Sequence, residues 1–389
     1  MRKLALSDEI LMKVEKPARY IGGEYNSVIK DKDKIDVRFC MCFPDVYEIG
    51  MSHLGIQILY DMFNRREDTW CERVYSPWPD LDAEMRKHAI PLFALESQDP
   101  IKDFDFLGIT LQYEMCYTNI LQVLDLSGIP LRTKDRKKGD TLVIGGGPCS
   151  YNPEPIADFF DIFYMGEGEV SYDELLELYK VYKHSDMTRQ EFLIKVSNIP
   201  GLYVPELYEV TYHEDGTIAS FGPKFDGVPA TVTKTVVMDH SKVTYPEKPV
   251  VSFMKLTQDR VVLEIMRGCI RGCRFCQAGM IYRPTRPKNV DMLKGYAEKM
   301  LASTGHEEIT FSSLSSSDYE DLPELTDCLI EKMDNEHVNI SLPSLRIDAF
   351  SLDVMSKIQD VKKSSLTFAP EAGTQSCLLY TSPSPRDCS

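Results

Sequence analysis

Three cysteines within a short segment constrain this chain more than any other feature. Cys269, Cys273 and Cys276 are spaced C-x3-C-x2-C, and Phe275 stands directly before the third thiol. Three thiolates this close in sequence can hold three irons of a cubane iron–sulfur cluster. The next cysteine along the chain is Cys328, so the motif supplies no fourth ligand of its own. The spacing predicts a cluster with one iron open to a small molecule, whereas a zinc site would need a fourth ligand from afar.

A basic stretch surrounds these cysteines in an otherwise acidic chain. The net charge is −16, yet residues 267–288 contain no Asp or Glu. The cations of this stretch are Arg267, Arg271, Arg274, Arg283, Arg286 and Lys288. Because cations near a thiol favour the thiolate form that metals bind, the stretch is expected to support the cluster. A solvated basic loop is the alternative.

The bulk properties are those of a soluble protein. A chain of 389 residues predicts two or three domains. It contains no apolar run of the roughly 20 residues that a membrane helix needs, and its N-terminus lacks a signal-peptide core. We therefore expect a cytoplasmic protein without membrane association, whose 11 cysteines serve metal or redox chemistry or are buried thiols. The acidic charge disfavours casual binding to nucleic acid, although the basic stretch leaves a nucleic-acid substrate open.

Apolar strands alternate with helices in the N-terminal part. Strands are predicted at 35–43, 104–110, 141–145 and 160–164, and helices at 55–64, 117–126 and 172–182. This alternation predicts a doubly wound parallel α/β sheet over residues 1–184, with ligands at the carboxyl ends of the strands. Residues 185–255 are predicted to be a β-rich connector, with extended segments at 202–206, 208–212 and 231–239 and a hairpin turn at 213–217.

A second alternation begins directly before the cysteines. Strands are predicted at 261–266, 308–312, 338–342 and 365–369, and helices at 290–303, 322–334 and 353–358. Residues 256–376 thus predict the first half of a (β/α) barrel, with the cysteines at the carboxyl end of its first strand. Residues 377–389 resemble a translated sequencing-library adaptor, so the natural sequence is expected to stop near Gln375, as the front part of a longer protein.

The cysteine motif resembles that of the radical S-adenosylmethionine (radical SAM) superfamily. In that family three thiolates hold a [4Fe–4S] cluster, and the open iron binds the amino and carboxylate groups of S-adenosylmethionine (SAM). One electron then cleaves the sulfonium to a 5′-deoxyadenosyl radical. The resemblance implies the three cysteines as cluster ligands and an external one-electron donor such as a flavodoxin or ferredoxin. It assigns SAM contacts to Phe275, to Ser312 and Ser313 for the amino group, to Arg346 for a carboxylate and to Glu371 for the ribose.

The N-terminal part resembles the cobalamin-binding domain that precedes many radical SAM domains. The loop after the first strand of that domain reads D-x-H-x-x-G, with the His as the lower cobalt ligand, and here it reads Asp45-Val-Tyr47-Glu-Ile-Gly50. The resemblance implies a cobalamin site at Tyr47, Gly50, Thr110, Gly145, Gly146 and Gly147. Tyr47 leaves two alternatives: cobalamin binds without that ligand, or the domain has lost it. His53, nearby, is expected to pack or to cap the following helix.

The function predicted from the resemblance is that of a radical SAM enzyme with an unknown substrate. SAM cleavage at the cluster would start radical chemistry, with methyl transfer if cobalamin binds. The alternative is an iron–sulfur binding or electron-transfer module that does not turn over SAM. A further possibility is that this shortened chain is inactive although its full-length parent is an enzyme. The sequence names no catalytic acid or base.

Overall fold

The chain folds as two units. The computed structural model describes residues 4–333, 338–342 and 374. The first unit comprises Met1–Thr244 and Val250–Thr257, and the second comprises Tyr245–Pro249 and the chain from Gln258 onward. Most of the predicted connector, residues 185–255, therefore lies in the first unit.

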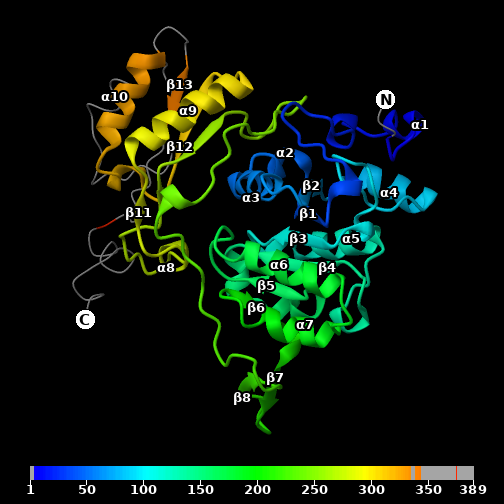
Figure 1. Ribbon diagram of the computed structural model, residues 1–389. Helices are drawn as coiled ribbons and strands as arrows, with labels where there is room; N and C mark the ends of the chain where they lie inside the picture. Colours follow the sequence, from blue (N-terminus) through cyan, green and yellow to red (C-terminus); the bar gives the residue numbers. More distant parts are fainter. Residues whose placement is uncertain (1–3, 334–337, 343–373, 375–389) are drawn as a thin grey trace. The chain divides into compact units, whose positions relative to one another are not determined.

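A six-stranded sheet forms the centre of the first unit (Figure 1). Its strands are β1 (Val37–Phe43), β2 (Thr69–Tyr75), β3 (Phe106–Thr110), β4 (Leu142–Gly146), β5 (Ile162–Tyr164) and β6 (Leu202–Tyr203). The order is β2-β1-β3-β4-β5-β6, with β6 antiparallel to β5 and the other pairs parallel. The predicted doubly wound sheet is confirmed. Because β2 lies beyond β1 on one side and β3 on the other, the strand order reverses between β1 and β3, where such sheets bind ligands.

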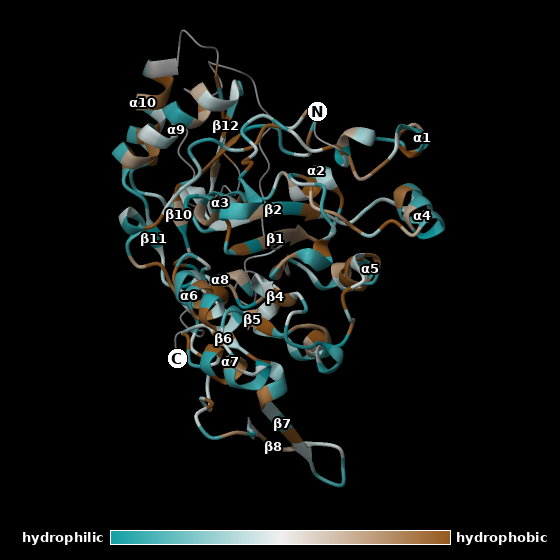
Figure 2. Cartoon of the chain, turned by 45° about the vertical axis from the view of Figure 1, so that its right-hand side comes forward, coloured by the Kyte–Doolittle hydropathy of each residue, from teal (hydrophilic) through white to brown (hydrophobic). Residues whose placement is uncertain are grey.

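Five helices of eight or more residues accompany this sheet. They are α3 (Leu54–Asn64), α4 (Pro79–His88), α5 (Tyr117–Ser127), α6 (Tyr172–Lys183) and α7 (Arg189–Val196). Each buries one apolar face, and Figure 2 shows the hydrophilic colour on the outer turns of α4 and α7. The sequence analysis did not predict β2, α4 or α7. Strand β2 is fully buried but contains Glu72 and Arg73, which interrupt its apolar pattern.

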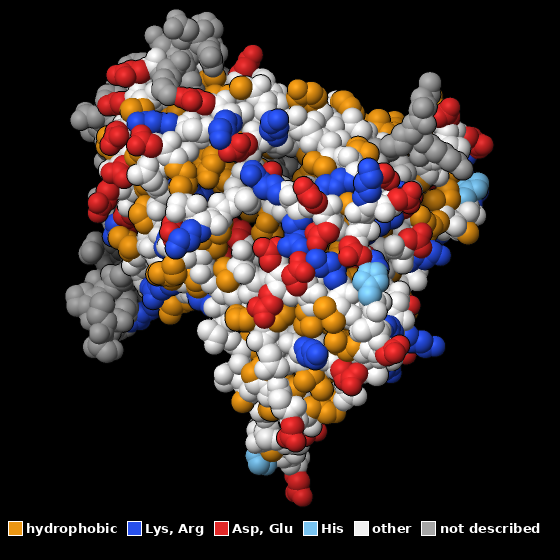
Figure 3. Space-filling view, in the orientation of Figure 1, with side chains coloured by type: hydrophobic (Ala, Val, Ile, Leu, Met, Phe, Trp, Pro, Cys, Tyr) orange, Lys and Arg blue, Asp and Glu red, His pale blue; other side chains and the backbone are white. Residues whose placement is uncertain are grey.

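The surface of the first unit carries both charge signs. Around the N-terminal half of α6, Arg66 bonds to Asp68, Asp173 and Glu177. Figure 3 shows acidic and basic side chains interspersed over this face. The excess of acidic residues therefore does not form a single-sign patch on that face.

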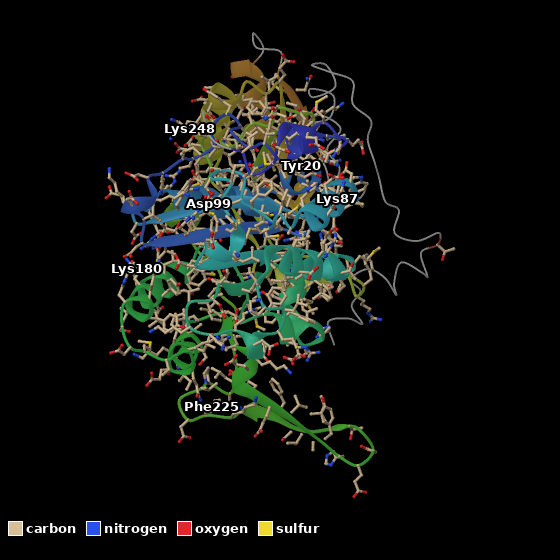
Figure 4. All side chains as sticks on the ribbon, turned by 90° about the vertical axis from the view of Figure 1, so that its right-hand side faces the viewer. Tyr20, Lys87, Asp99, Lys180, Phe225 and Lys248 are labelled. Carbon is tan, nitrogen blue, oxygen red and sulfur yellow. The ribbon has the colours of Figure 1, made fainter. Side chains whose placement is uncertain are left out.

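The predicted hairpin is confirmed as β7 (Tyr208–Tyr212) and β8 (Ile218–Pro223). It projects from the first unit, and Phe225 lies at its base (Figure 4). The predicted extended segment 231–239 is wrong as a strand, because Thr235 alone forms a bridge there, with Gly166.

The second unit contains a parallel sheet in the order β13-β12-β9. Its elements are β9 (Val261–Glu264), β10 (Met266–Arg267), α8 (Ala278–Ile281), β11 (Arg286–Pro287), α9 (Val290–Thr304), β12 (Glu308–Ser312), α10 (Leu322–Met333) and β13 (Asn339–Ser341). This confirms the predicted strand–helix succession through the third strand. The predicted elements at 353–358 and 365–369, the site residues Arg346 and Glu371, and the segment 377–389 lie outside the described residues.

Within the part of the chain that the structure describes, no helix is long and apolar enough to span a membrane.

Candidate cluster and cofactor site

The three cysteines lie on one loop at the carboxyl end of β9. Cys269, Cys273 and Cys276 fall between β10 and α8, and all three are half-buried and form no disulfide within the described residues. Strands β10 and β11 pair in antiparallel fashion and close the base of this excursion. The loop therefore leaves and re-enters the unit at one point, directly beyond the first strand of the parallel sheet, as the sequence predicted.

A glycine allows the tight closure of the loop base. Gly268 has φ +82°, and a Cβ at this position would lie 2.4 Å from the carbonyl oxygen of Pro284. The buried guanidinium of Arg286 donates to the same oxygen at 2.9 Å and to the Tyr282 carbonyl oxygen at 3.2 Å. Only a residue without Cβ adopts this backbone conformation at such close range without strain.

The basic stretch is not a solvated patch. Arg267 Nε and Lys288 Nζ both bond to Glu264 Oε2, at 2.9 and 2.7 Å, and Arg271 pairs with Asp318. Lys288 and Arg286 are themselves buried. Arg283 Nη2 donates to the Arg271 carbonyl at 3.2 Å, so at least five of the six cations have partners within the unit. The alternative of a solvated basic loop is therefore wrong for most of this stretch. The sequence concealed this because Glu264 and Asp318 lie outside the acid-free stretch.

Glu264 ends β9 beneath the cysteine loop. Burial opposes its ionisation, but Lys288 and Arg267 outweigh burial and lower the pKa of Glu264 to about 2. Tyr245 adds to the arrangement: its hydroxyl accepts the Glu264 N–H at 3.0 Å, and its ring lies 4.2 Å from Lys288 Nζ. The carboxylate is therefore ionised and holds both ends of the excursion, through Arg267 before it and Lys288 after it.

The serine-rich segment after β12 is the neighbour of the cysteine loop. Strands β9 and β12 are adjacent, with Ser312 beside Glu264 in register. The Ser312 carbonyl accepts the Ile265 N–H at 3.0 Å, and Ser313 Oγ lies 3.0 Å from Ser316 Oγ. Both predicted serines therefore lie at the expected strand end, with these groups already engaged in the unit.

Ser315 is the polar group in this segment that the sequence analysis missed. It is 1% exposed, and its hydroxyl makes no hydrogen bond within the described residues. A buried hydroxyl without a partner is costly, so such a group points to a ligand or water. No sequence signal distinguishes Ser315 from the four other serines of Phe311–Tyr319.

Two contacts join the cysteine loop to this segment. Arg271 bonds to both carboxylate oxygens of Asp318, and the Tyr319 hydroxyl donates to the Lys288 carbonyl at 2.8 Å. The structure thus brings together the cysteine loop and the serine-rich segment, which the sequence could only place at neighbouring strand ends. Phe275 is 61% exposed on the loop.

The three thiol side chains are of the ligand type that iron–sulfur clusters use. Thiolates are the ligands that such clusters use, and the Arg271 N–H already donates to Cys269 Sγ at 3.4 Å, as hydrogen bonds to cluster sulfurs do. Within residues 4–333, 338–342 and 374, no three His, Cys, Asp or Glu side chains converge as metal ligands. The cysteines are therefore carried by one loop, but their sulfurs are not gathered in advance.

The predicted cobalamin residues are placed differently. Tyr47 begins the short helix α2 (Tyr47–Gly50) and is buried, with its hydroxyl 3.0 Å from Glu24 Oε1 and 3.1 Å from Ser252 Oγ. Thr110 Oγ1 lies 3.4 Å from the Cys42 carbonyl. Tyr47 and Thr110 are engaged within the fold, so neither presents a free group to a corrin ring.

The space beside most glycines of this predicted site is already filled by other atoms of the chain. A Cβ on Gly50 would lie 2.3 Å from the Tyr75 ring, and one on Gly145 would lie 2.8 Å from Leu111 Cδ1. Gly146 has ordinary clearance, and Gly147, with φ +116°, would place a Cβ 2.8 Å from the Leu111 carbonyl. These residues therefore do not fit a corrin with its nucleotide tail passing along the glycines.

His53 caps α3, as predicted. Its Nδ1 accepts the Ile56 N–H at 3.3 Å, and burial lowers its pKa to about 4. The imidazole is therefore neutral near pH 7 and caps the N-terminus of α3.

Comparison with known proteins agrees with the site. Residues 55–205 match the family described as "Radical SAM proteins, N-terminal", and residues 263–385 match "Radical SAM superfamily". The two matches together cover more than half of the chain. This chain belongs to the radical SAM superfamily. Membership implies a [4Fe–4S] cluster and SAM as cofactors, in agreement with the cysteine loop of this radical SAM protein.

A curated relative and a solved structure extend the comparison. The radical SAM protein is 29% identical over 336 residues to an uncharacterized protein of Methanocaldococcus jannaschii, a match that covers 86% of this chain. This chain therefore spans only 60% of that relative's length.

One solved structure with a similar fold is that of OxsB, a cobalamin-dependent S-adenosylmethionine radical enzyme. With aqua-cobalamin and SAM bound, OxsB matches with a TM-score of 0.54 at 13% identity, over 88% of this chain and 45% of OxsB. With aqua-cobalamin alone, the TM-score is 0.50 at 13% identity, over 84% and 42%. At this identity the likeness concerns the fold, which is the predicted α/β sheet followed by a partial barrel.

Proposed function

We propose that this radical SAM protein cleaves SAM reductively at a [4Fe–4S] cluster held by Cys269, Cys273 and Cys276. When bound, the cluster supplies the electron that converts SAM to methionine and a 5′-deoxyadenosyl radical. The electron itself comes from an external donor of the flavodoxin or ferredoxin kind. A substrate molecule then loses a hydrogen atom, and cobalamin enters no step.

One observation supports this proposal above the others. The loop that carries three cysteines and no fourth is tied, through Arg271 and Asp318, to a strand end where the buried Ser315 hydroxyl has no hydrogen-bond partner among the described residues. Ligands bind such sheets at the carboxyl ends of the strands. A cofactor that contacts both the loop and the strand end would satisfy the Ser315 hydroxyl.

In this function, residues around the cysteine loop would position the loop and the cofactor. Glu264 fixes both ends of the cysteine loop, and Gly268 allows its closure. Ser315 and Ser313 present hydroxyls that can accept from the ammonium of SAM. Phe275, exposed beside the third thiol, offers an apolar surface to the cofactor.

The test is anaerobic reconstitution of the purified chain with iron and sulfide, followed by SAM and dithionite. Release of 5′-deoxyadenosine and methionine is expected, together with a change in the electron paramagnetic resonance (EPR) spectrum of the reduced cluster on adding SAM. Cys269→Ala, Cys273→Ala and Cys276→Ala should each abolish both signals. Cys328→Ala, a matched change in α10, should retain them. A cluster that forms but whose spectrum SAM leaves unchanged, with no products, would favour the electron-transfer module.

A further inference from the structure

The ligand-binding edge of the first unit is bridged by the chain's own contacts. In a doubly wound sheet the crevice lies at the carboxyl ends of the strands where their order reverses, here β1 and β3. The Tyr113 hydroxyl, from the segment after β3, bonds to Asp45 Oδ2, from the loop after β1. Asn119 Nδ2 donates to the Pro44 carbonyl at 2.9 Å. Both contacts cross the position that a ligand would enter.

Tyr47 is fastened to a buried charge cluster. Its partner Glu24 lies 3.0 Å from Arg73 Nη2, and Arg73 Nε lies 2.6 Å from Glu96 Oε1. The side chains of these three charged residues are at most 2% exposed. To turn Tyr47 outward would break its hydrogen bond to a carboxylate that cannot reach water, and uncompensated buried charge is strongly unfavourable.

The segment 250–257, which leads out of the first unit, is held by the D-x-Y-x-x-G loop and by Tyr25. Besides the Tyr47–Ser252 contact, the Val251 N–H donates to the Tyr25 carbonyl at 2.9 Å. The Thr257 N–H reaches the Glu48 carbonyl at 3.5 Å. Residues 250–257 therefore pack on the first unit through Tyr47 and Glu48 of the D-x-Y-x-x-G loop and through Tyr25, immediately before the chain enters β9.

The space beside the glycines is filled as well. A Cβ on Gly145 would meet Leu111 Cδ1 at 2.8 Å and the Phe160 ring at 3.0 Å, so these side chains occupy the face that a nucleotide tail would need. Leu111 is fully buried and Phe160 is 1% exposed. Displacing them would open a cavity in the core, which strongly destabilises a fold.

We infer that the D-x-Y-x-x-G loop of this chain is a structural anchor for residues 250–257, and that the first unit does not bind cobalamin with its nucleotide tail inserted. The inference goes beyond the proposed function and does not depend on it, because the contacts that carry it all lie in the first unit.

The first test uses cob(II)alamin and an excess of the full chain, followed by EPR. Binding with the tail inserted detaches the nucleotide base from cobalt and removes the nitrogen superhyperfine splitting of the base-on form. The splitting is expected to persist with wild type, because Leu111 and Phe160 occupy the face beside Gly145 that the inserted tail would need. Loss of the splitting with wild type would overturn the inference.

The second test measures the anchor. Tyr47→Phe removes the hydroxyl that joins Glu24 to Ser252, and Tyr212→Phe makes the same change at a 63% exposed position on the hairpin. Tryptic cleavage after Lys255, an exposed residue of the anchored segment, should accelerate roughly tenfold in Tyr47→Phe and stay unchanged in Tyr212→Phe. Equal rates in the two variants would contradict the anchor.

Should Tyr47→Phe fail to fold, Ser252→Ala removes the same contact from the segment's side. It is expected to give the same acceleration at Lys255. Cleavage of Ser252→Ala at the wild-type rate would overturn the anchor independently of Tyr47.

Discussion

Arg271, between Cys269 and Cys273, donates from Nε and Nη2 to the two carboxylate oxygens of Asp318, after β12. The Nε–Oδ2 distance is 3.0 Å, and the Asp318 side chain is 6% exposed. A two-point bond of a guanidinium to a carboxylate fixes orientation as well as distance. The relationship therefore sets where the cysteine loop lies against the serine-rich segment.

Asp318→Asn should loosen the cysteine loop. The amide offers one acceptor and no charge, so one of the two bonds to Arg271 is lost, at a cost of about 1–3 kcal/mol. We expect less iron per chain after reconstitution and desalting, and faster loss to a chelator. Asp291→Asn, at a side chain that is 88% exposed, is the control. Wild-type iron retention in Asp318→Asn would show that the contact does not support the cluster site.

Gly268→Ala should weaken the loop base. Its φ of +82° and the 2.4 Å approach of the Pro284 oxygen leave no room for a methyl group, so strain or rearrangement follows. The expected result is poor cluster incorporation.

Gly295→Ala is the matched control for Gly268→Ala. Gly295 lies within α9, and apart from its chain neighbours and its own helix backbone no described atom lies within 4 Å of an added Cβ. Here the alanine should stabilise the helix by about 0.5–1 kcal/mol. Thermal melts and iron content of the two variants would separate the effects, and equal cluster incorporation in both would contradict the role of Gly268.

Glu264→Gln should destabilise the second unit by about 3–5 kcal/mol near pH 7, because Arg267 and Lys288 lose their buried partner. The folded-state pKa of about 2 lies below that of an unfolded glutamate, so the carboxylate stabilises the fold fully above about pH 4.5. This contribution is lost as pH falls from about 4.5 towards 2. Hydrogen exchange of the β9 amides, followed by mass spectrometry, measures the stability of the second unit.

The pH dependence separates Glu264 from the other carboxylates. The difference in protection between wild type and Glu264→Gln should shrink between about pH 4.5 and 2. Glu320→Gln, at an exposed position, should follow wild type throughout. A difference that stays constant with pH would argue against an ionised, doubly paired Glu264.

Ser315→Ala should leave stability nearly unchanged and weaken SAM binding. The hydroxyl makes no hydrogen bond within the described part of the chain, so its removal breaks no hydrogen bond there. A lost contact to the cofactor would raise the Kd roughly 5- to 10-fold. Calorimetric titration of the reconstituted protein with SAM measures this. Loss of thermal stability with unchanged SAM affinity would assign Ser315 to the fold instead.

Regular periodicity made the helices and most strands predictable. The segments 55–64, 117–126 and 290–303 and the strand 308–312 were predicted nearly at their observed bounds, because each buries one apolar face or an apolar run. Strand β2 could not be predicted in this way. Its Glu72 and Arg73 are buried because Arg38, Glu24 and Glu96 pair with them from remote parts of the chain.

The sequence by itself determined the chemistry that this protein can carry: three thiols on one loop, without a fourth, directly after a strand. Such a motif is local, since ligand type and spacing lie within a few residues. Only the tertiary structure decided the fate of the charges and of the second motif. Arg271 meets Asp318, Lys288 meets Glu264, and Tyr47 turns to Glu24 and Ser252, because burial forces each polar group to find a partner wherever folding brings one near.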